Sequence, residues 1–206
     1  MPNRRTISFS CPACGRSFAM TKWIHISPDD DPALRKHAMT GALFQRTCPH
    51  CGKHMTIVYN CLYQDRRKKF VVSLCADRKQ PAVAPLLPGY RMRLECTLPA
   101  FLERIRILDA GLNDMAFELY RTVVLTQVRR QYPDRPVTSL RFDAVEGDDI
   151  FLQASRTEQV KLPLSSYQTI AERVRQSGFR PKVSGYLSIH GKWVRQSGIL
   201  DILKTQ

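Results

Sequence analysis

Four cysteines in two short repeats are the residues of this chain whose types and spacing point most directly to chemistry. The segments "CPACG" and "CPHCG" share one pattern, in which two cysteines are separated by a proline and one further residue. The pairs are Cys11 with Cys14 and Cys48 with Cys51. Two Cys-x-x-Cys pairs supply the thiolates of a tetrahedral site, and zinc is the metal that such a site most often binds. The sequence therefore predicts a Zn²⁺ ion bound by all four cysteines.

The surroundings of the two pairs favour a zinc ribbon with an insertion. Each pair is followed by a glycine, Gly15 or Gly52, which can take the positive φ that a tight turn around a metal requires. Alternating apolar and polar residues on both sides of each pair predict strands. The 33 residues between the pairs exceed the roughly 15 to 20 of compact sites. A short helix predicted at 32–40 accounts for the extra length.

Other uses of the thiols are less well supported. An odd number of cysteines, seven, and the lack of a secretory leader argue against a disulfide framework. Redox motifs usually occur once, at the start of a helix, whereas here two pairs lie between strands. An iron–sulfur centre remains an alternative for the same ligands. The other cysteines are predicted to be small buried hydrophobic residues: Cys61, Cys75 and Cys96.

The predicted metal site is structural rather than catalytic, because four thiolates leave no open position for water. His50, inside the second pair, is expected to be a surface residue rather than a ligand. The sequence contains no phosphate-binding loop, metalloprotease motif, nucleophile elbow or dinucleotide fingerprint. We therefore expect a protein that is not an enzyme.

The chain is strongly basic. Its formal net charge is +14, and residues 1–80 carry 14 Lys and Arg against 5 Asp and Glu. Such a field attracts nucleic acids and acidic protein surfaces. If nucleic acid is the partner, the expected contacts are cations on phosphates and aromatic rings that stack on bases. These residues are Arg4, Arg5, Lys53, Arg66, Arg67, Lys68 and Lys69 for phosphates, with Trp23 and Tyr63 for stacking.

The order of predicted elements indicates an α+β fold in two lobes. The first, residues 1–80, is a zinc-ribbon-like β lobe with an inserted short helix. A segment rich in proline, "DRKQPAVAPLLPG", is predicted to join it to the second lobe, residues 81–206. That lobe contains two helices from residue 98 to about 128, a β-hairpin over 140–154 and a further helix ending near Gly178.

The paired motif and two later segments resemble one protein family. Together with "LYQDRRKKFVV" and "FLERIRILDAGLNDMAFELYR", the two CPxC repeats are similar to the CpXC family of bacterial proteins, over residues 1 to about 125. The resemblance implies that Cys11, Cys14, Cys48 and Cys51 are the cysteines shared with that family. It implies no activity.

Two functions are compatible with these observations. One is a non-catalytic adaptor whose zinc lobe presents a rigid surface to a protein partner or complex. The other is a basic zinc-ribbon protein that binds RNA or DNA. No apolar segment approaches the roughly 18 residues that span a bilayer, so the expected location is cytoplasmic. The sequence does not determine the oligomeric state.

Overall fold

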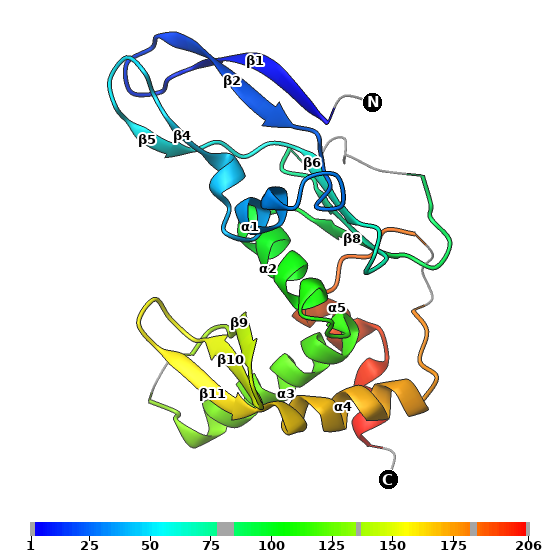
Figure 1. The fold of residues 1–206 in the computed structure, drawn as a ribbon. Coiled ribbons are helices and arrows are strands. Elements are labelled where there is room, and N and C mark those ends of the chain that lie inside the picture. Colours follow the sequence, from blue (N-terminus) through cyan, green and yellow to red (C-terminus); the bar gives the residue numbers. More distant parts are fainter. Residues whose placement is uncertain (1–2, 78–84, 135–136, 182–184, 205–206) are drawn as a thin grey trace. The chain divides into compact units, whose positions relative to one another are not determined.

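The chain folds as two compact units. A computed structural model describes residues 3–77, 85–134, 137–181 and 185–204 (Figure 1). Contacts within the chain divide it into unit 1, Met1–Ile105, and unit 2, Arg106–Gln206. The chain combines helices with β-sheets in both units, which confirms the α+β class. No helix of the described residues has the length and apolar character needed to cross a bilayer.

The boundary between the units differs from the one expected at residue 80. It lies inside helix α2 (Leu98–Asp109). Strand β8 (Arg91–Glu95) pairs in parallel with strand β7 (Phe70–Leu74), so the first sheet continues beyond the predicted linker. Most of that linker, residues 78–84, lies outside the described residues. The sequence pattern marked an interruption of regular structure, but it did not show that the strands on both sides pair with each other.

Unit 1 is built around a mixed sheet of four strands in the order β3-β6-β7-β8. Strand β3 (His25–Ile26) runs parallel to β6 (Cys61–Asp65), and β6 runs antiparallel to β7. All five residues of β7, "FVVSL", are buried. A strand that is buried on both faces reads as a continuous apolar run, and β7 is accordingly an inner strand of the sheet.

Two short helices and the start of α2 complete the core of unit 1. Helix α1 (Ala33–Met39) corresponds to the predicted insertion and is followed by a 3₁₀ turn, η1 (Ala42–Phe44). The ring of Phe44 contacts that of Phe101 on α2 edge to face, with 6.2 Å between the centroids. Both rings are fully buried, and together they fix η1 against α2.

Two hairpins make up the rest of unit 1 and lie together at one end of it (Figure 1). The first pairs β1 (Arg4–Ser10) with β2 (Ser17–Trp23), and the second pairs β4 (Gln45–Thr47) with β5 (His54–Thr56). Most of their residues are exposed or only half-buried. The hairpins therefore have little apolar core of their own.

Unit 2 packs helices against one face of an antiparallel sheet. Helix α3 (Asp114–Gln131) packs against α4 (Leu164–Gln176) and α5 (Gly191–Gln196), and a 3₁₀ helix, η2 (Ile199–Leu203), follows. The sheet has the order β11-β10-β9. Its strands are β9 (Arg141–Glu146), β10 (Asp149–Gln153) and β11 (Gln159–Pro163). The predicted hairpin is β9 with β10, and β11 is a third strand that was not predicted.

Four aromatic side chains form the centre of unit 2. Phe117 on α3 contacts Phe142 on β9 edge to face, with 5.4 Å between the centroids. Tyr120 packs edge to face on Tyr167 of α4 at 5.9 Å. Helix α3 therefore contacts both the sheet and α4 through these two rings. Asn113 caps this helix by accepting hydrogen bonds from the backbone N–H groups that follow it.

A buried ion pair gives a test of how unit 1 is held together. Arg104 on α2 donates from Nε to Glu95 Oε1 of β8 at 2.9 Å, and both side chains are less than a tenth exposed. Removing Arg104 takes this ion pair away from the buried Glu95 carboxylate, so we expect Arg104→Met to destabilise unit 1 by about 3 kcal/mol. The double substitution Glu95→Leu with Arg104→Met should cost less than the sum of the single ones. Urea unfolding of the four proteins measures this coupling, and additive losses would contradict it.

Candidate metal centre

The two CPxC turns are structural copies of each other. In the first, Gly15 N–H donates to the Cys11 carbonyl at 2.8 Å, and in the second, Gly52 N–H donates to the Cys48 carbonyl at 3.0 Å. The glycines have nearly equal φ values of +71° and +70°, which confirms the expected left-handed conformation. The first cysteine of each pair is buried, and the second is exposed. Local sequence therefore produces the same turn twice.

In each hairpin a side-chain hydrogen bond joins the two strands next to the CPxC turn. It connects the residue before the first cysteine with the first residue of the following strand. In the first hairpin the Ser10 and Ser17 hydroxyl oxygens lie 2.9 Å apart, and in the second Thr47 Oγ1 lies 2.8 Å from His54 Nδ1. These side-chain bonds connect residues that pair in register across the strands, so each turn projects from a closed strand end.

The four sulfurs come together at one point. The Sγ atoms of Cys11, Cys14, Cys48 and Cys51 all lie within 4.8 Å of one another. Across the hairpins, Cys11 lies 3.8 Å from Cys51, and Cys14 lies 3.8 Å from Cys48. A tetrahedron of sulfurs about 2.3 Å from a central ion has edges of about 3.8 Å. The four cysteines thus form a set that can hold one metal ion.

Electrostatics within the cluster also favour a bound cation. Burial opposes ionisation of Cys11, but the N–H groups of Ala13 and Cys14 and two neighbouring thiols outweigh it and lower the pKa of Cys11 to about 7. The Lys53 amide favours the Cys51 thiolate, yet burial and the other three cysteines raise the pKa of Cys51 to about 12. A thiolate at one cysteine therefore makes deprotonation of the other thiols less favourable. A cation bound between the sulfurs would offset this repulsion, since metal binding and thiol deprotonation are coupled.

Two side chains of the second hairpin reach the first hairpin directly. The Arg46 guanidinium donates to the Thr21 carbonyl of β2 at 2.7 Å, and His50 Nε2 lies 3.2 Å from the Ser17 carbonyl oxygen. His50 was expected to be a surface residue, and it is exposed, but its ring forms one of these contacts. No pattern in the sequence indicated the role of Arg46. Both residues help to position the second pair of cysteines relative to the first.

A third link comes from Tyr59, which sequence reasoning also missed. Its hydroxyl donates to the Leu43 carbonyl at 3.1 Å and accepts from the Trp23 N–H at 3.4 Å. The ring packs on Phe44 with 5.0 Å between the centroids, and burial raises the pKa of the Tyr59 hydroxyl. Tyr59 therefore ties the end of β2 to the segment that enters the second hairpin. Its position after an apolar run was the only available signal.

A family comparison agrees with this centre. The family model described as "CpXC protein" matches residues 9–121. The chain belongs to the CpXC family. Comparison with curated proteins and with solved structures gave no match. The CpXC region includes all four cysteines and the three linking residues Arg46, His50 and Tyr59, and it extends into helix α3 of unit 2.

Four of the predicted partner-binding residues lie on the hairpins of the CpXC region or at their edge. Arg4 and Arg5 are exposed on β1, and Lys53 is exposed directly after the second CPxC turn. Trp23 is half-buried at the end of β2, where the Arg4 guanidinium lies 5.9 Å from the centre of its ring. These positions are compatible with the predicted contacts.

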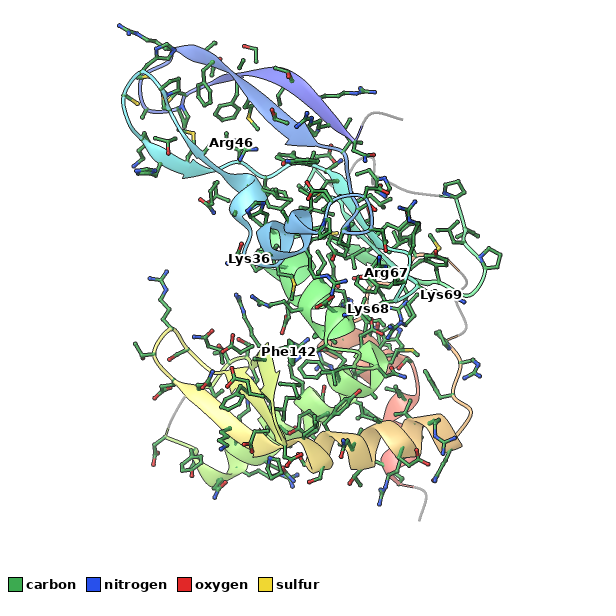
Figure 2. All side chains as sticks on the ribbon, in the orientation of Figure 1. Lys36, Arg46, Arg67, Lys68, Lys69 and Phe142 are labelled. Atoms are coloured by element: carbon green, nitrogen blue, oxygen red, sulfur yellow. The ribbon has the colours of Figure 1, made fainter. Side chains whose placement is uncertain are left out.

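The other predicted cations lie at the turn between β6 and β7, in a different part of unit 1 (Figure 2). Arg66 forms ion pairs with Asp29 and Asp30, and Arg67 lies 3.4 Å from Asp29. Asp29 and Asp30 belong to an acidic run directly before α1, and their carboxylates offset this basic turn, while Asp31 accepts a hydrogen bond from the Ala33 N–H at the start of the helix. The predicted cations therefore do not form one continuous surface. Lys68 and Lys69 belong to the same turn, in which Lys69 has a φ of +51°.

Two predictions from the sequence were wrong. Tyr63 is completely buried and stacked on Phe70, with 5.7 Å between the ring centroids, so its ring is not available to a nucleic-acid base. Cys96 is exposed, whereas Cys61 and Cys75 are buried as expected. Tyr63 lies on β6, an inner strand of the sheet, and Cys96 follows the last residue of β8. The local sequence pattern shows neither which strands are inner ones nor where β8 ends.

The link made by Arg46 can be tested without changing a metal ligand. We expect Arg46→Met to weaken metal binding by about tenfold, because the loss of a charge-assisted hydrogen bond of about 1.5 kcal/mol loosens the second hairpin. Arg16→Met is the matched control, since Arg16 is an exposed arginine of the first CPxC turn. Competition with a chromophoric chelator measures the affinity. Equal affinity of the two variants would contradict a positioning role for Arg46.

Proposed function

We propose that unit 1 is a non-catalytic interaction module held in shape by a structural Zn²⁺ ion. The observation that carries this proposal is the set of four sulfurs within 4.8 Å, two from each hairpin. A donor set made only of thiolates suits zinc better than magnesium, calcium or manganese, which prefer oxygen. Zinc has no redox chemistry and accepts tetrahedral geometry, which the spacing of the sulfurs fits.

The role assigned to the ion is mechanical. A catalytic zinc keeps one position for water or substrate, and here the four thiolates occupy all four positions. The ion instead joins two hairpins that have little apolar core of their own. Because a structural zinc ion contributes its binding free energy to folding, the hairpins present one fixed surface only when the metal is bound.

The charge of that surface suggests the chemistry of the partner. Residues 1–28 and 32–64, which contain both hairpins, include no Asp or Glu. Arg4, Arg5, Arg16 and Lys53 are exposed there. Four thiolates around Zn²⁺ carry a formal charge of about −2, which these cations exceed. The proposed partner is therefore a protein with an acidic surface, bound by a module that acts as an adaptor.

Nucleic acid is the second candidate, and one observation favours it. Arg4 lies over the ring of Trp23 beside the exposed Arg5, and a cation next to a partly exposed aromatic ring is common in sites for single strands. The pairing of Arg66 and Arg67 with carboxylates weakens this candidate. A nucleic-acid surface would then be confined to the hairpins.

Zinc dependence is tested by removing one ligand from each pair. We expect Cys11→Ser and Cys48→Ser to lose bound zinc and to lower the melting temperature by about 10 °C or more, because the metal contributes several kcal/mol to folding. Cys96→Ser is the control, since this thiol is exposed outside the cluster. Elemental analysis by mass spectrometry identifies and counts the metal. A full equivalent of zinc in both ligand variants, or iron in place of zinc in the native protein, would contradict the proposal.

The two candidate partners are separated by charge reversal combined with nuclease treatment. We expect Arg4→Glu with Arg5→Glu to lose the proteins captured by the native chain, while Arg180→Glu with Lys192→Glu, an equal change in unit 2, keeps them. The captured proteins should survive nuclease treatment of the lysate and should be identified by mass spectrometry.

Loss of the captured material with nuclease would instead support the second candidate. In that case purified protein should retain a single-stranded RNA of 30 nucleotides in a mobility-shift assay. Four phosphate contacts would give a slope of about −3 for log K against log salt. Equal capture by the native chain and by the β1 variant would exclude the hairpin surface for both candidates.

A further inference from the structure

Unit 2 has a groove along the edge of its sheet that β11 forms. A cavity of about 560 Å³ runs between the second half of α3 and strand β11. Its apolar walls include Val124 and Val128 of α3 and Val160 and Leu162 of β11. In the sheet order β11-β10-β9, the described strands pair with β11 on one side only. The groove therefore follows a strand whose second edge is open.

The hydrogen bonds beside β11 determine which of its backbone groups face that open edge. The Ala154 N–H donates to the Glu158 carbonyl at one end, and the Leu164 N–H donates to the Asp148 carbonyl at the other. Both contacts continue the antiparallel register of β10 with β11. Since hydrogen-bonded and non-hydrogen-bonded pairs alternate in such a ladder, the even-numbered residues of β11 bond β10.

The odd-numbered residues of β11 consequently direct their backbone groups outward. Gln159 and Lys161 each present one N–H and one C=O at the open edge, and Pro163 presents only a carbonyl. Val160 and Leu162, which alternate with them, turn their side chains toward the groove. An extended chain placed beside β11 can therefore form backbone hydrogen bonds while every second side chain enters the groove, whose lining combines apolar side chains with polar ones that include Glu158.

Lysine at an edge strand often prevents such pairing, but Lys161 is held away from this edge. Its ammonium group binds Asp149 of β10 at 2.8 Å and lies 6.0 Å from the centre of the Phe151 ring. Both partners belong to the neighbouring strand, so the lysine lies across the outer face of the sheet. The edge is left with its backbone groups accessible.

A basic pocket adjoins the groove at the end of the sheet. This cavity of about 480 Å³ shares Ala154 with the groove and is lined by Arg141, Arg156 and two serines, with no carboxylate among its lining residues. The loop that carries Arg156 is ordered by Ser155, whose hydroxyl accepts from the Thr157 and Glu158 N–H groups at 3.3 and 3.1 Å. The pocket therefore offers two guanidinium groups to a negative charge at one end of the groove.

We propose that this groove binds an extended, acidic peptide segment of another protein, which adds to the sheet as a strand beside β11. Alternate apolar side chains of the peptide occupy the groove between β11 and α3, and an acidic residue at one end binds Arg141 and Arg156. The inference goes beyond the function proposed for unit 1, because it needs neither the metal nor the hairpins.

The test starts from a random library of 12-residue peptides displayed on phage and selected on the full chain. Selected peptides should share alternating apolar residues next to one or more acidic ones. Their affinity is then compared for Lys161→Pro and Lys161→Thr. Both variants lose the ammonium group, but only proline removes the outward N–H, which is not used by the sheet. We expect Lys161→Pro to weaken binding by about tenfold or more relative to Lys161→Thr.

Further variants separate the two parts of the site from the metal centre. Arg141→Glu with Arg156→Glu should weaken binding, whereas Lys192→Glu on α5 and Cys48→Ser in unit 1 should not change it. Peptide binding should also slow amide hydrogen exchange at Gln159 and Lys161.

Three outcomes would overturn the proposal. One is that no peptide is enriched, and another is that the Lys161→Pro and Lys161→Thr proteins bind the selected peptides equally well while both remain folded. The third is a dimer in sedimentation experiments that dissociates on Lys161→Pro substitution, since the occupant would then be β11 of a second copy. Because Cys48→Ser tests the zinc module separately, failure of either proposal leaves the other open to its own test.

Discussion

The convergence of four sulfurs on one point is the constraint on which the hairpin end of unit 1 depends. The hairpins bury few side chains, so hydrophobic burial alone stabilises them only weakly. Their closed strand ends aim each pair of cysteines at the other pair, and Arg46, His50 and Tyr59 connect the two hairpins around the cluster. These contacts are few and polar. A central ion that bonds all four sulfurs would therefore supply most of the cohesion between the hairpins.

The charged residues of unit 1 are distributed in a way that favours four sulfurs close together. Four thiolates close together repel one another, and a cation with basic surroundings reduces that repulsion. Both hairpin segments lack carboxylates entirely. The acidic run at 29–31 instead lies where it pairs with the basic turn between β6 and β7. The excess positive charge of unit 1 is thus concentrated on the hairpins, and the second group of cations is largely offset. Unit 2 differs, because four aromatic side chains form its centre and a groove with apolar walls lies beside the outer edge of β11.

Local patterns predicted the elements far better than their arrangement. The two CPxC turns, the glycine conformations, the insertion helix α1, helix α3 and the hairpin of β9 with β10 all follow from neighbouring residues. Strand β8 was expected to open the second lobe, and it pairs instead with β7 of the first sheet. Parallel pairing joins strands that are separated by a long connection, so no local signal reports it. The two-residue strand β3 was missed for a related reason, since it is too short to show a periodicity of its own. Strand β11 does alternate over Gln159–Pro163, but this signal was not used.

For the candidate site, the sequence by itself determined the four candidate ligands and the family, because the ability to bind a metal depends on residue type and short spacing. Only the tertiary structure decided that the sulfurs of the two hairpins meet, and which side chains hold them there. It also decided that Tyr63 is buried, that Cys96 is exposed and that Arg66 and Arg67 are paired with carboxylates. Burial and ion pairing depend on residues far away in the sequence. The type of a residue limits which ligands its side chain can bind, and the fold determines which other residues that side chain contacts.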